Sequence, residues 1–136
     1  MLNGILPATW TPTIHAIVRI VTGLMFIEHG TSKVIAFPIT DAMAGMYAQM
    51  GAMTQVTAAF EVIGGLLIII GAFTRLTAFI LAGFMAIAFW GVHVGMAKSI
   101  FPIINGGEAA ALYCMIFLAL AAVGAGPYSV DAARNQ

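Results

Sequence analysis

Four long apolar segments constrain the fold of this chain more than any other feature of its sequence. The hydrocarbon core of a bilayer is about 30 Å thick, and a helix of about 20 mostly apolar residues crosses it. Segments of this kind cover about residues 12–37, 53–73, 76–96 and 107–124. An open sheet leaves edge groups unsatisfied in lipid, and these runs lack the alternating pattern of a membrane barrel. The sequence therefore predicts an all-α fold: a transmembrane four-helix up-down bundle, in a single domain over 1–136.

The scarcity of charged residues also indicates that the chain is surrounded by lipid. Of the 136 residues 62% are hydrophobic and 7% charged, whereas about a quarter are charged in soluble proteins. The formal net charge is zero, so the chain lacks the basic face that nucleic-acid binding requires. Cys114 is the one cysteine, which excludes an intramolecular disulfide or a CxxC pair. We expect the lipid bilayer to be the main partner, and we expect no nucleic-acid partner.

The segment between the first two spans, residues 39–52, is too short to cross the bilayer and predicts a short interfacial helix. Four methionines follow one another at helical spacing from this segment to the first residue of the second span: Met43, Met46, Met50 and Met53. We expect them to pack against lipid or the bundle; the second interpretation is a Cu(I) site, since thioethers select that ion. No Lys or Arg precedes Arg19, so the first helix is expected to remain in the mature protein rather than to serve as a signal peptide.

Ionisable residues inside membrane spans cost about 2.5–3.5 kcal/mol each and are functional candidates by default. Alternating helix direction is expected to gather seven of them in one half of the bilayer: Glu28, His29, Lys33, Glu61, His93, Lys98 and Glu108. Glu61 is the most informative, because a rise of 1.5 Å per residue puts it about 3 Å from the centre of its helix. It needs a proton or a cationic partner. We expect that partner on the first helix, with Lys33 preferred and Arg19 next.

One stripe of polar and aromatic residues runs along the first helix. Its members recur at steps of four, three, four, three and four: His15, Arg19, Thr22, Phe26, His29 and Lys33. Such a stripe is expected to face the bundle axis. The alternative is structural: the histidines lie near headgroups, the charged residues reach water and Arg19 anchors to phosphates. Small residues are expected to allow close helix contact, namely Gly23, Gly64, Gly65, Gly83 and Gly91, and Cys114 is expected to fill space.

These residues, in this order, resemble a known family. The matching pieces are Arg19, Gly23-Leu-Met-Phe26-Ile-Glu-His29-Gly30-Thr-Ser-Lys33, Glu61-Val-Ile-Gly64-Gly65-Leu-Leu, Gly71-Ala-Phe-Thr74-Arg75, His93, Gly107-Glu108 and Gly124-Ala-Gly126-Pro-Tyr-Ser129-Val-Asp131. Over nearly the whole chain they are similar to the DoxX family of small four-helix membrane proteins. The resemblance implies a link to membrane oxidoreductases: some members form a subunit of a thiosulfate:quinone oxidoreductase, and others associate with enzymes of thiol and oxidative-stress defence. It also implies a bacterial-type plasma (inner) membrane, with the termini and the turn at Thr74-Arg75 in the cytoplasm.

The first functional hypothesis is a subunit of a quinone-linked oxidoreductase. A quinone needs a cleft at membrane depth, hydrogen-bond donors for its carbonyls and a group that exchanges protons. We expect Glu61 to relay protons, His29 and His93 to donate to the carbonyls, and Lys33 or Arg19 to stabilise an anionic reduced form. The aromatic residues expected around the ring are Phe26, Phe60, Phe89 and Trp90. With one cysteine and no nucleotide motif, electrons must come from a redox partner, a metal or the substrate.

Two alternatives stay open. His29 and His93, completed by Glu28, Glu61 or Glu108, have the chemistry to hold haem iron, copper or zinc. In a different class, the same residues form a proton or solute pathway in a small transporter, which would require a homo-oligomer, or the chain anchors a soluble enzyme.

Overall fold

The computed structural model of the chain describes residues 5–134, and every regular element in this range is a helix. This confirms the predicted all-α class. Three helical runs are long and apolar enough to cross a membrane: α1 (Thr11–Val34) with the preceding 3-10 turn η1 (Ala8–Trp10), α3 (Ala52–Ile70), and Thr74–Ala97. The fourth apolar helix, α7 (Glu108–Val123), has 16 residues, which rise about 24 Å. It is therefore shorter than the fourth span that the sequence predicts.

The remaining elements connect or interrupt these long helices. The run Thr74–Ala97 consists of α4 (Thr74–Ile87), the π-helical segment η2 (Ala88–Val94) and α5 (Gly95–Ala97). Short helices lie between and after the long ones: α2 (Asp41–Met50), α6 (Pro102–Asn105) and α8 (Val130–Arg134).

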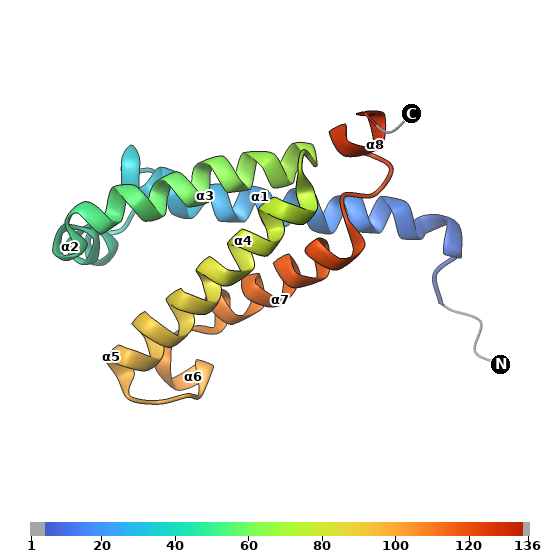
Figure 1. Cartoon of the computed structure of the whole chain (residues 1–136). Coiled ribbons are helices and arrows are strands. Elements are labelled where there is room, and N and C mark those ends of the chain that lie inside the picture. The colour runs from blue at the N-terminus through green and yellow to red at the C-terminus, as the bar shows by residue number, and fades with distance from the viewer. Residues whose placement is uncertain (1–4, 135–136) are drawn as a thin grey trace. The chain divides into compact units, whose positions relative to one another are not determined.

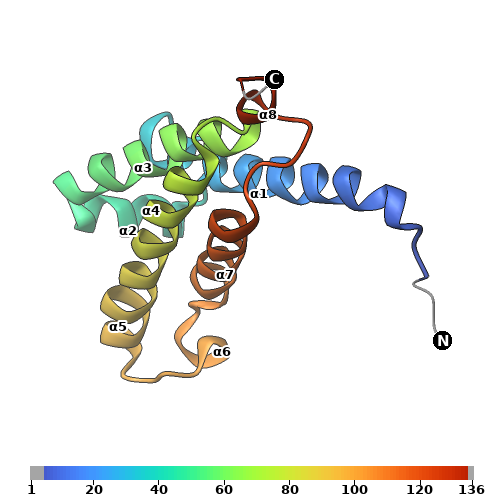
Figure 2. The same cartoon turned by 45° about the vertical axis from the view of Figure 1, so that its right-hand side comes forward.

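The helices form two compact units, each built on one pair of long helices. The first comprises the chain up to Ala72 together with the part from Ala125 onward, and the second is Phe73–Gly124. In the first unit α1 and α3 run side by side, with α2 at one end of the pair (Figures 1 and 2). In the second unit α4 and α7 run side by side.

The first helix ends earlier than its apolar run suggests. We expected it to continue to Phe37, but the helix ends at Val34 and Ala36 has a positive φ of 54°. Proline restricts the residue before it to extended conformations, so Phe37, which precedes Pro38, cannot close a helical turn. The apolar residues beyond Val34 therefore belong to the connection.

The turn between α3 and α4 also differs from the prediction by a few residues. Gly71 ends α3 in the left-handed conformation, with φ 67° and ψ 48°, which glycine adopts without steric cost. Thr74 and Arg75, which we expected to form the turn, are the first residues of α4. Ending α3 at Gly71 places Arg75 on a helix, where its side chain has a structural contact described below.

Close contact between α1 and α3 depends on small residues. A Cβ on Gly23 would lie 2.7 Å from Cγ1 of Ile69 and 2.9 Å from the backbone oxygen of Gly65. A Cβ on Gly30 would lie 3.1 Å from the backbone oxygen of Ala58. Only residues without side chains allow backbones to approach so closely. The predicted role of Gly23 and Gly65 is thus confirmed.

Two glycines of the second unit make no such contact within that unit. A Cβ on Gly83 or on Gly91 would meet no atom within 4 Å in the part of the chain that is described. Gly83 and Gly91 therefore do not mark close helix contacts within Phe73–Gly124.

The polarity of the first unit is reversed relative to a soluble protein. Arg19 and Glu61 are buried, with 1% and 5% of their surface exposed, whereas Leu24 and Ile63 on the same helices are 51% and 59% exposed. Apolar groups on the outside and charged groups on the inside suit a chain whose solvent is lipid. Within the predicted stripe of α1, Arg19 is buried together with Thr22 and Phe26.

Candidate functional site

An ion pair buried between α1 and α3 is the centre of the candidate site. Lys33 lies in the last turn of α1 and Glu61 in the middle of α3. The Nζ atom of Lys33 donates to both carboxylate oxygens of Glu61, at 2.6 and 2.7 Å. Their side chains are only 9% and 6% exposed. The expected pairing of Glu61 with Lys33 is therefore present, in the tight geometry that a desolvated ion pair needs.

Hydroxyl groups complete the coordination of the pair. Thr57, one helical turn before Glu61, accepts the third hydrogen bond of Lys33 Nζ at 3.2 Å and donates its own to the backbone oxygen of Thr54 at 3.1 Å. An ammonium group has three N–H donors, and all three of Lys33 are engaged. The pair is thus satisfied within the protein.

Tyr47 covers the same ammonium group from α2. The centre of its ring lies 5.7 Å from Nζ of Lys33, within the range of a cation–π interaction. Its hydroxyl forms a 3.0 Å hydrogen bond with the hydroxyl of Ser32, which donates to the backbone oxygen of His29 at 2.8 Å. Thr54 donates to the backbone oxygen of Tyr47 at 2.9 Å. Tyr47 therefore ties α2 to both long helices of the unit.

Our sequence reasoning missed these hydroxyl groups. A signal was present for two of them, because Thr54 and Thr57 precede Glu61 by seven and four residues and share its helix face. Ser32 and Tyr47 carried no comparable signal, since their contact joins two helices whose packing the sequence does not reveal.

The other predicted residues of α1 differ in their surroundings. Phe26 is 1% exposed and belongs to the core. Glu28 and His29 are exposed, and Thr31 donates from its hydroxyl to the backbone oxygen of Glu28 at 3.2 Å. Of the residues proposed for catalysis, the first unit thus brings Lys33 and Glu61 into contact and leaves His29 at its surface.

Arg19 lies at the opposite end of the α1–α3 pair from Lys33. Its Nη1 donates to the backbone oxygens of Ile68 and Ile69, at 2.8 and 2.6 Å, and its Nη2 donates to the backbone oxygen of Tyr128 at 2.5 Å. The last carbonyls of a helix have no partner within the helix, and a cation at that end is favourable. Arg19 thus caps α3 and holds the C-terminal segment against it.

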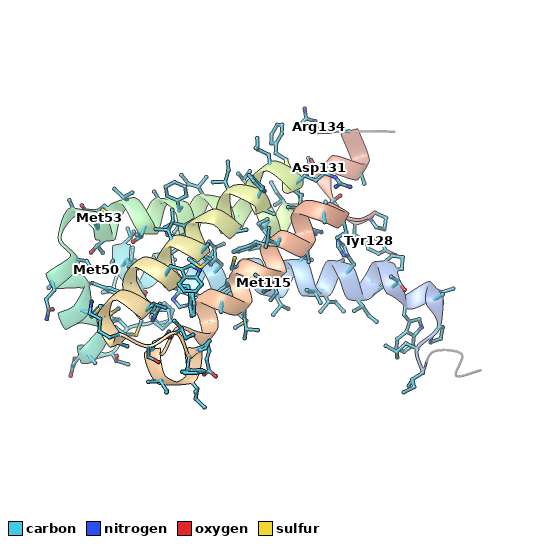
Figure 3. The ribbon with its side chains drawn as sticks, turned by 60° about the horizontal axis from the view of Figure 1, so that its bottom comes forward. Met50, Met53, Met115, Tyr128, Asp131 and Arg134 are labelled. Carbon is cyan, nitrogen blue, oxygen red and sulfur yellow. The ribbon has the colours of Figure 1, made fainter. Side chains whose placement is uncertain are left out.

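The C-terminal segment has further contacts with the same end of α3. Figure 3 labels Tyr128, Asp131 and Arg134 along it. The backbone N–H of Asp131 donates to the backbone oxygen of Gly71 at 2.9 Å. The hydroxyl of Ser129 accepts from the N–H of Ala132 at 3.1 Å and so stabilises the start of α8. Residues remote in sequence are thereby joined at one end of the first unit.

Arg75 has an equivalent role in the second unit. It donates to the backbone oxygens of Ala121 at 3.1 Å, of Val123 at 3.3 Å and of Ala122, all in the last turn of α7. Each unit therefore has an arginine on its first long helix that caps the end of its second. The acceptors are backbone carbonyls in both cases.

The second unit contains the other predicted site residues. His93 and Trp90 lie in the π-helical segment η2, a geometry that often marks functional positions. Nδ1 of His93 is 3.2 Å from the backbone oxygen of Asn105. A carbonyl only accepts, so Nδ1 carries a proton in this contact. Trp90 makes an edge-to-face contact with Phe89, with ring centres 5.3 Å apart.

The start of α7 packs closely against this segment. A Cβ on Gly107 would lie 2.8 Å from Cδ2 of Phe89 and 3.0 Å from Cβ of His93. Glu108 follows as the exposed first residue of α7. The predicted convergence of all seven ionisable residues involves both units and stays a prediction.

Metal-ligand chemistry has limited support among the described residues. In residues 5–134 no group of three or more His, Cys, Asp or Glu side chains is placed to hold a metal ion. Cys114 is buried in α7. The four methionines of the predicted interfacial helix do not share one helix, because α2 ends at Met50 and Met53 lies in α3 (Figure 3).

Three membrane-length apolar helical runs, two of which carry a charged residue on their buried side, define a small, multi-span integral membrane protein. The comparisons with known proteins agree. The DoxX family model matches residues 14–94. An uncharacterised protein of Haemophilus influenzae is 44% identical over 124 residues, which is 90% of this chain and 91% of that protein. Inner membrane protein YqjF of Escherichia coli is 29% identical over 127 residues, 88% of this chain and 91% of that protein. No solved structure matches the chain. The chain belongs to the DoxX family.

Proposed function

We propose that the chain is the membrane subunit of a quinone-linked oxidoreductase system, and that the Lys33–Glu61 pair exchanges protons when the quinone is reduced or oxidised. The observation that carries this proposal is the burial of the pair within two apolar helices, with 9% and 6% of the side chains exposed. Burying two charges costs more free energy than their attraction commonly returns. Charged groups retained at such positions are functional by default.

The chemistry requires protons and electrons in equal number. Reduction of a quinone to a quinol takes up two electrons and two protons. The chain has one cysteine and no nucleotide motif, so the electrons come from a redox partner, a bound metal or the substrate. Glu61 relays protons from the aqueous side, and Lys33 holds the carboxylate in place and stabilises an anionic reduced form. His29 donates to a quinone carbonyl; roles for Trp90, His93 and Glu108 rest on the sequence.

Quinone binding is tested by tryptophan fluorescence, since the chain has two tryptophans. Titration of the purified protein with ubiquinone or menaquinone analogues is expected to give saturable quenching. Glu61→Gln should weaken binding of the quinone, whereas Asp41→Asn, which alters an exposed carboxyl of α2, should leave it unchanged. Quenching that is linear in quinone concentration, or equal in all three proteins, contradicts the proposal.

A second candidate is a non-catalytic proton or solute pathway in a homo-oligomer. The observation that favours it is the row of hydroxyls beside the pair, from Thr57 and Thr54 to Tyr47 and Ser32. In this case proteoliposomes conduct protons without any quinone, and Glu61→Gln abolishes the flux. Blank quinone titrations together with such flux would replace the first proposal by the second.

The architecture proposed for either function has four spans. We propose that α7 crosses the bilayer with the other three long helices, that α2 lies at the interface, and that both termini are cytoplasmic in a plasma membrane of bacterial type. Four spans put both termini on one side. Labelling of Arg134→Cys with a membrane-impermeant maleimide should then occur in inverted vesicles and not in intact cells; labelling of intact cells would contradict this sidedness.

A further inference from the structure

We propose that α2 is a movable cover over the Lys33–Glu61 pair, and that Tyr47 is the positioning residue that latches it. The inference rests on the proposed function in one respect: opening of α2 would be the route by which water and protons reach the Lys33–Glu61 pair. The latch itself is a property of the first unit alone and holds for a quinone-linked subunit and for a proton pathway.

The first argument is that the pair cannot exchange protons in the observed conformation. All three N–H donors of Lys33 are engaged by the oxygens of Glu61 and by Thr57. Both side chains of the pair are almost wholly buried, and the ring of Tyr47 lies against the ammonium group. Exchange with water therefore requires a group next to the pair to move.

The second argument is that α2 is attached weakly enough to be that group. Of its ten residues only Tyr47 is buried. The helix leads into α3 through Gly51, whose φ of 56° and ψ of −131° belong to a region that glycine enters readily. A segment with one buried side chain opens at far lower free energy than the long helices. Figures 1 and 2 show α2 at the end of the α1–α3 pair.

The third argument is that Tyr47 holds all three partners that a latch must join. Its hydroxyl binds Ser32 of α1, its backbone oxygen accepts from Thr54 of α3, and its ring covers Lys33. When Tyr47 leaves, the contacts of α2 with both long helices are lost together. The ammonium group then becomes open to water.

Access to the pair can be measured by cross-linking with a water-soluble carbodiimide. The reagent activates the Glu61 carboxyl, the Lys33 amine attacks it, and an amide bond forms between them while the carbodiimide takes up the water as a urea. Because Nζ lies 2.6 Å from the carboxylate, the cross-link forms as soon as the reagent enters. Its rate in the full-length protein in nanodiscs, followed by peptide mass spectrometry, reports the open population of α2.

Three variants define the expected result. Tyr47→Phe keeps the ring and loses one hydrogen bond, so the cross-linking rate should rise about fivefold. Tyr47→Ala loses the ring as well and should raise the cross-linking rate roughly a hundredfold. Compared with Tyr47→Ala, the phenylalanine variant should therefore keep α2 closed for most of the time. Gln49→Ala, on the exposed side of the same helix, should leave the rate unchanged.

Global unfolding is separated from opening by the amide exchange of Asp131, whose N–H donates to Gly71 at the far end of the first unit. If Tyr47→Ala accelerates that exchange, the variant unfolds more readily as a whole. The test then relies on Ser32→Ala and Tyr47→Phe, which keep the apolar packing. Equal cross-linking rates in the wild type and in the variants that remain folded overturn the latch. The latch is also overturned if Gln49→Ala raises the cross-linking rate as much as Tyr47→Phe does. Quinone binding and proton flux are measured separately from cross-linking. A negative result for either function therefore does not change what the cross-linking rates say about the latch.

Discussion

Removing Lys33 while Glu61 remains is expected to lower the free energy of unfolding by about 3–5 kcal/mol, the usual cost of breaking a buried ion pair from one side. Methionine is the closest apolar replacement for the lysine stem, so Lys33→Met removes the charge with little change in packing. The carboxylate would lose both of its contacts with Nζ, at 2.6 and 2.7 Å, in a position where 6% of its surface reaches solvent.

Replacing both partners should cost much less than replacing one. A buried ion pair is often replaced by apolar residues with no loss of stability, so Lys33→Met with Glu61→Leu is expected to be within about 1 kcal/mol of the wild type. The resulting coupling free energy is several kcal/mol, whereas an exposed ion pair gives only about 0.2–1 kcal/mol. The double-mutant cycle therefore distinguishes a desolvated pair from a surface one.

The assay is reversible unfolding in mixed micelles, followed by far-ultraviolet circular dichroism at fixed pH. Lys98→Met is the matched control, because Lys98 is exposed and its replacement should change the free energy by less than about 0.5 kcal/mol. Additive effects of the two single variants, or a cost of Lys33→Met below about 1 kcal/mol, would refute the reasoning.

Other parts of the structure give predictions of their own. Gly23→Ala should destabilise the protein by about 1–3 kcal/mol, because the new Cβ meets backbone and side-chain atoms at 2.7–2.9 Å, while Gly83→Ala should have little effect; equal unfolding free energies would contradict this. Arg19→Met should free the C-terminal segment, since the hydrogen bond to Tyr128 is lost, and proteolysis of that segment should become faster than in the wild type. Neutral His93 should carry its proton on Nδ1, and nitrogen NMR showing protonated Nε2 instead would exclude the bond to the carbonyl.

The sequence was sufficient to predict the long helices and the central pair because both follow from periodicity and chain direction. Spacing puts Lys33 on the same stripe as Phe26 and Arg19. Antiparallel order then brings the end of α1 towards the middle of α3, and Glu61 is the one acidic residue of that helix. A buried carboxylate needs a cation, and this physical requirement selected the partner.

Features that depend on tertiary contacts were not predictable in the same way. Arg19 and Arg75 bind backbone carbonyls, and every residue has such a carbonyl, so no residue type signals the acceptor. The docking of α2 is decided by a single side chain, Tyr47, whose environment is set by two other helices. The π-helical geometry around His93 is likewise a backbone feature for which the local sequence gave no cue that we recognised.

Redox-induced infrared difference spectroscopy on native membranes that contain the protein and its partner tests the central claim most directly. If the Lys33–Glu61 pair exchanges protons with a quinone, reduction of the quinone pool should produce a carboxyl band that disappears in Glu61→Gln and persists in Asp41→Asn. A carboxyl region that is identical in the wild type and in Glu61→Gln would show that the pair is only structural.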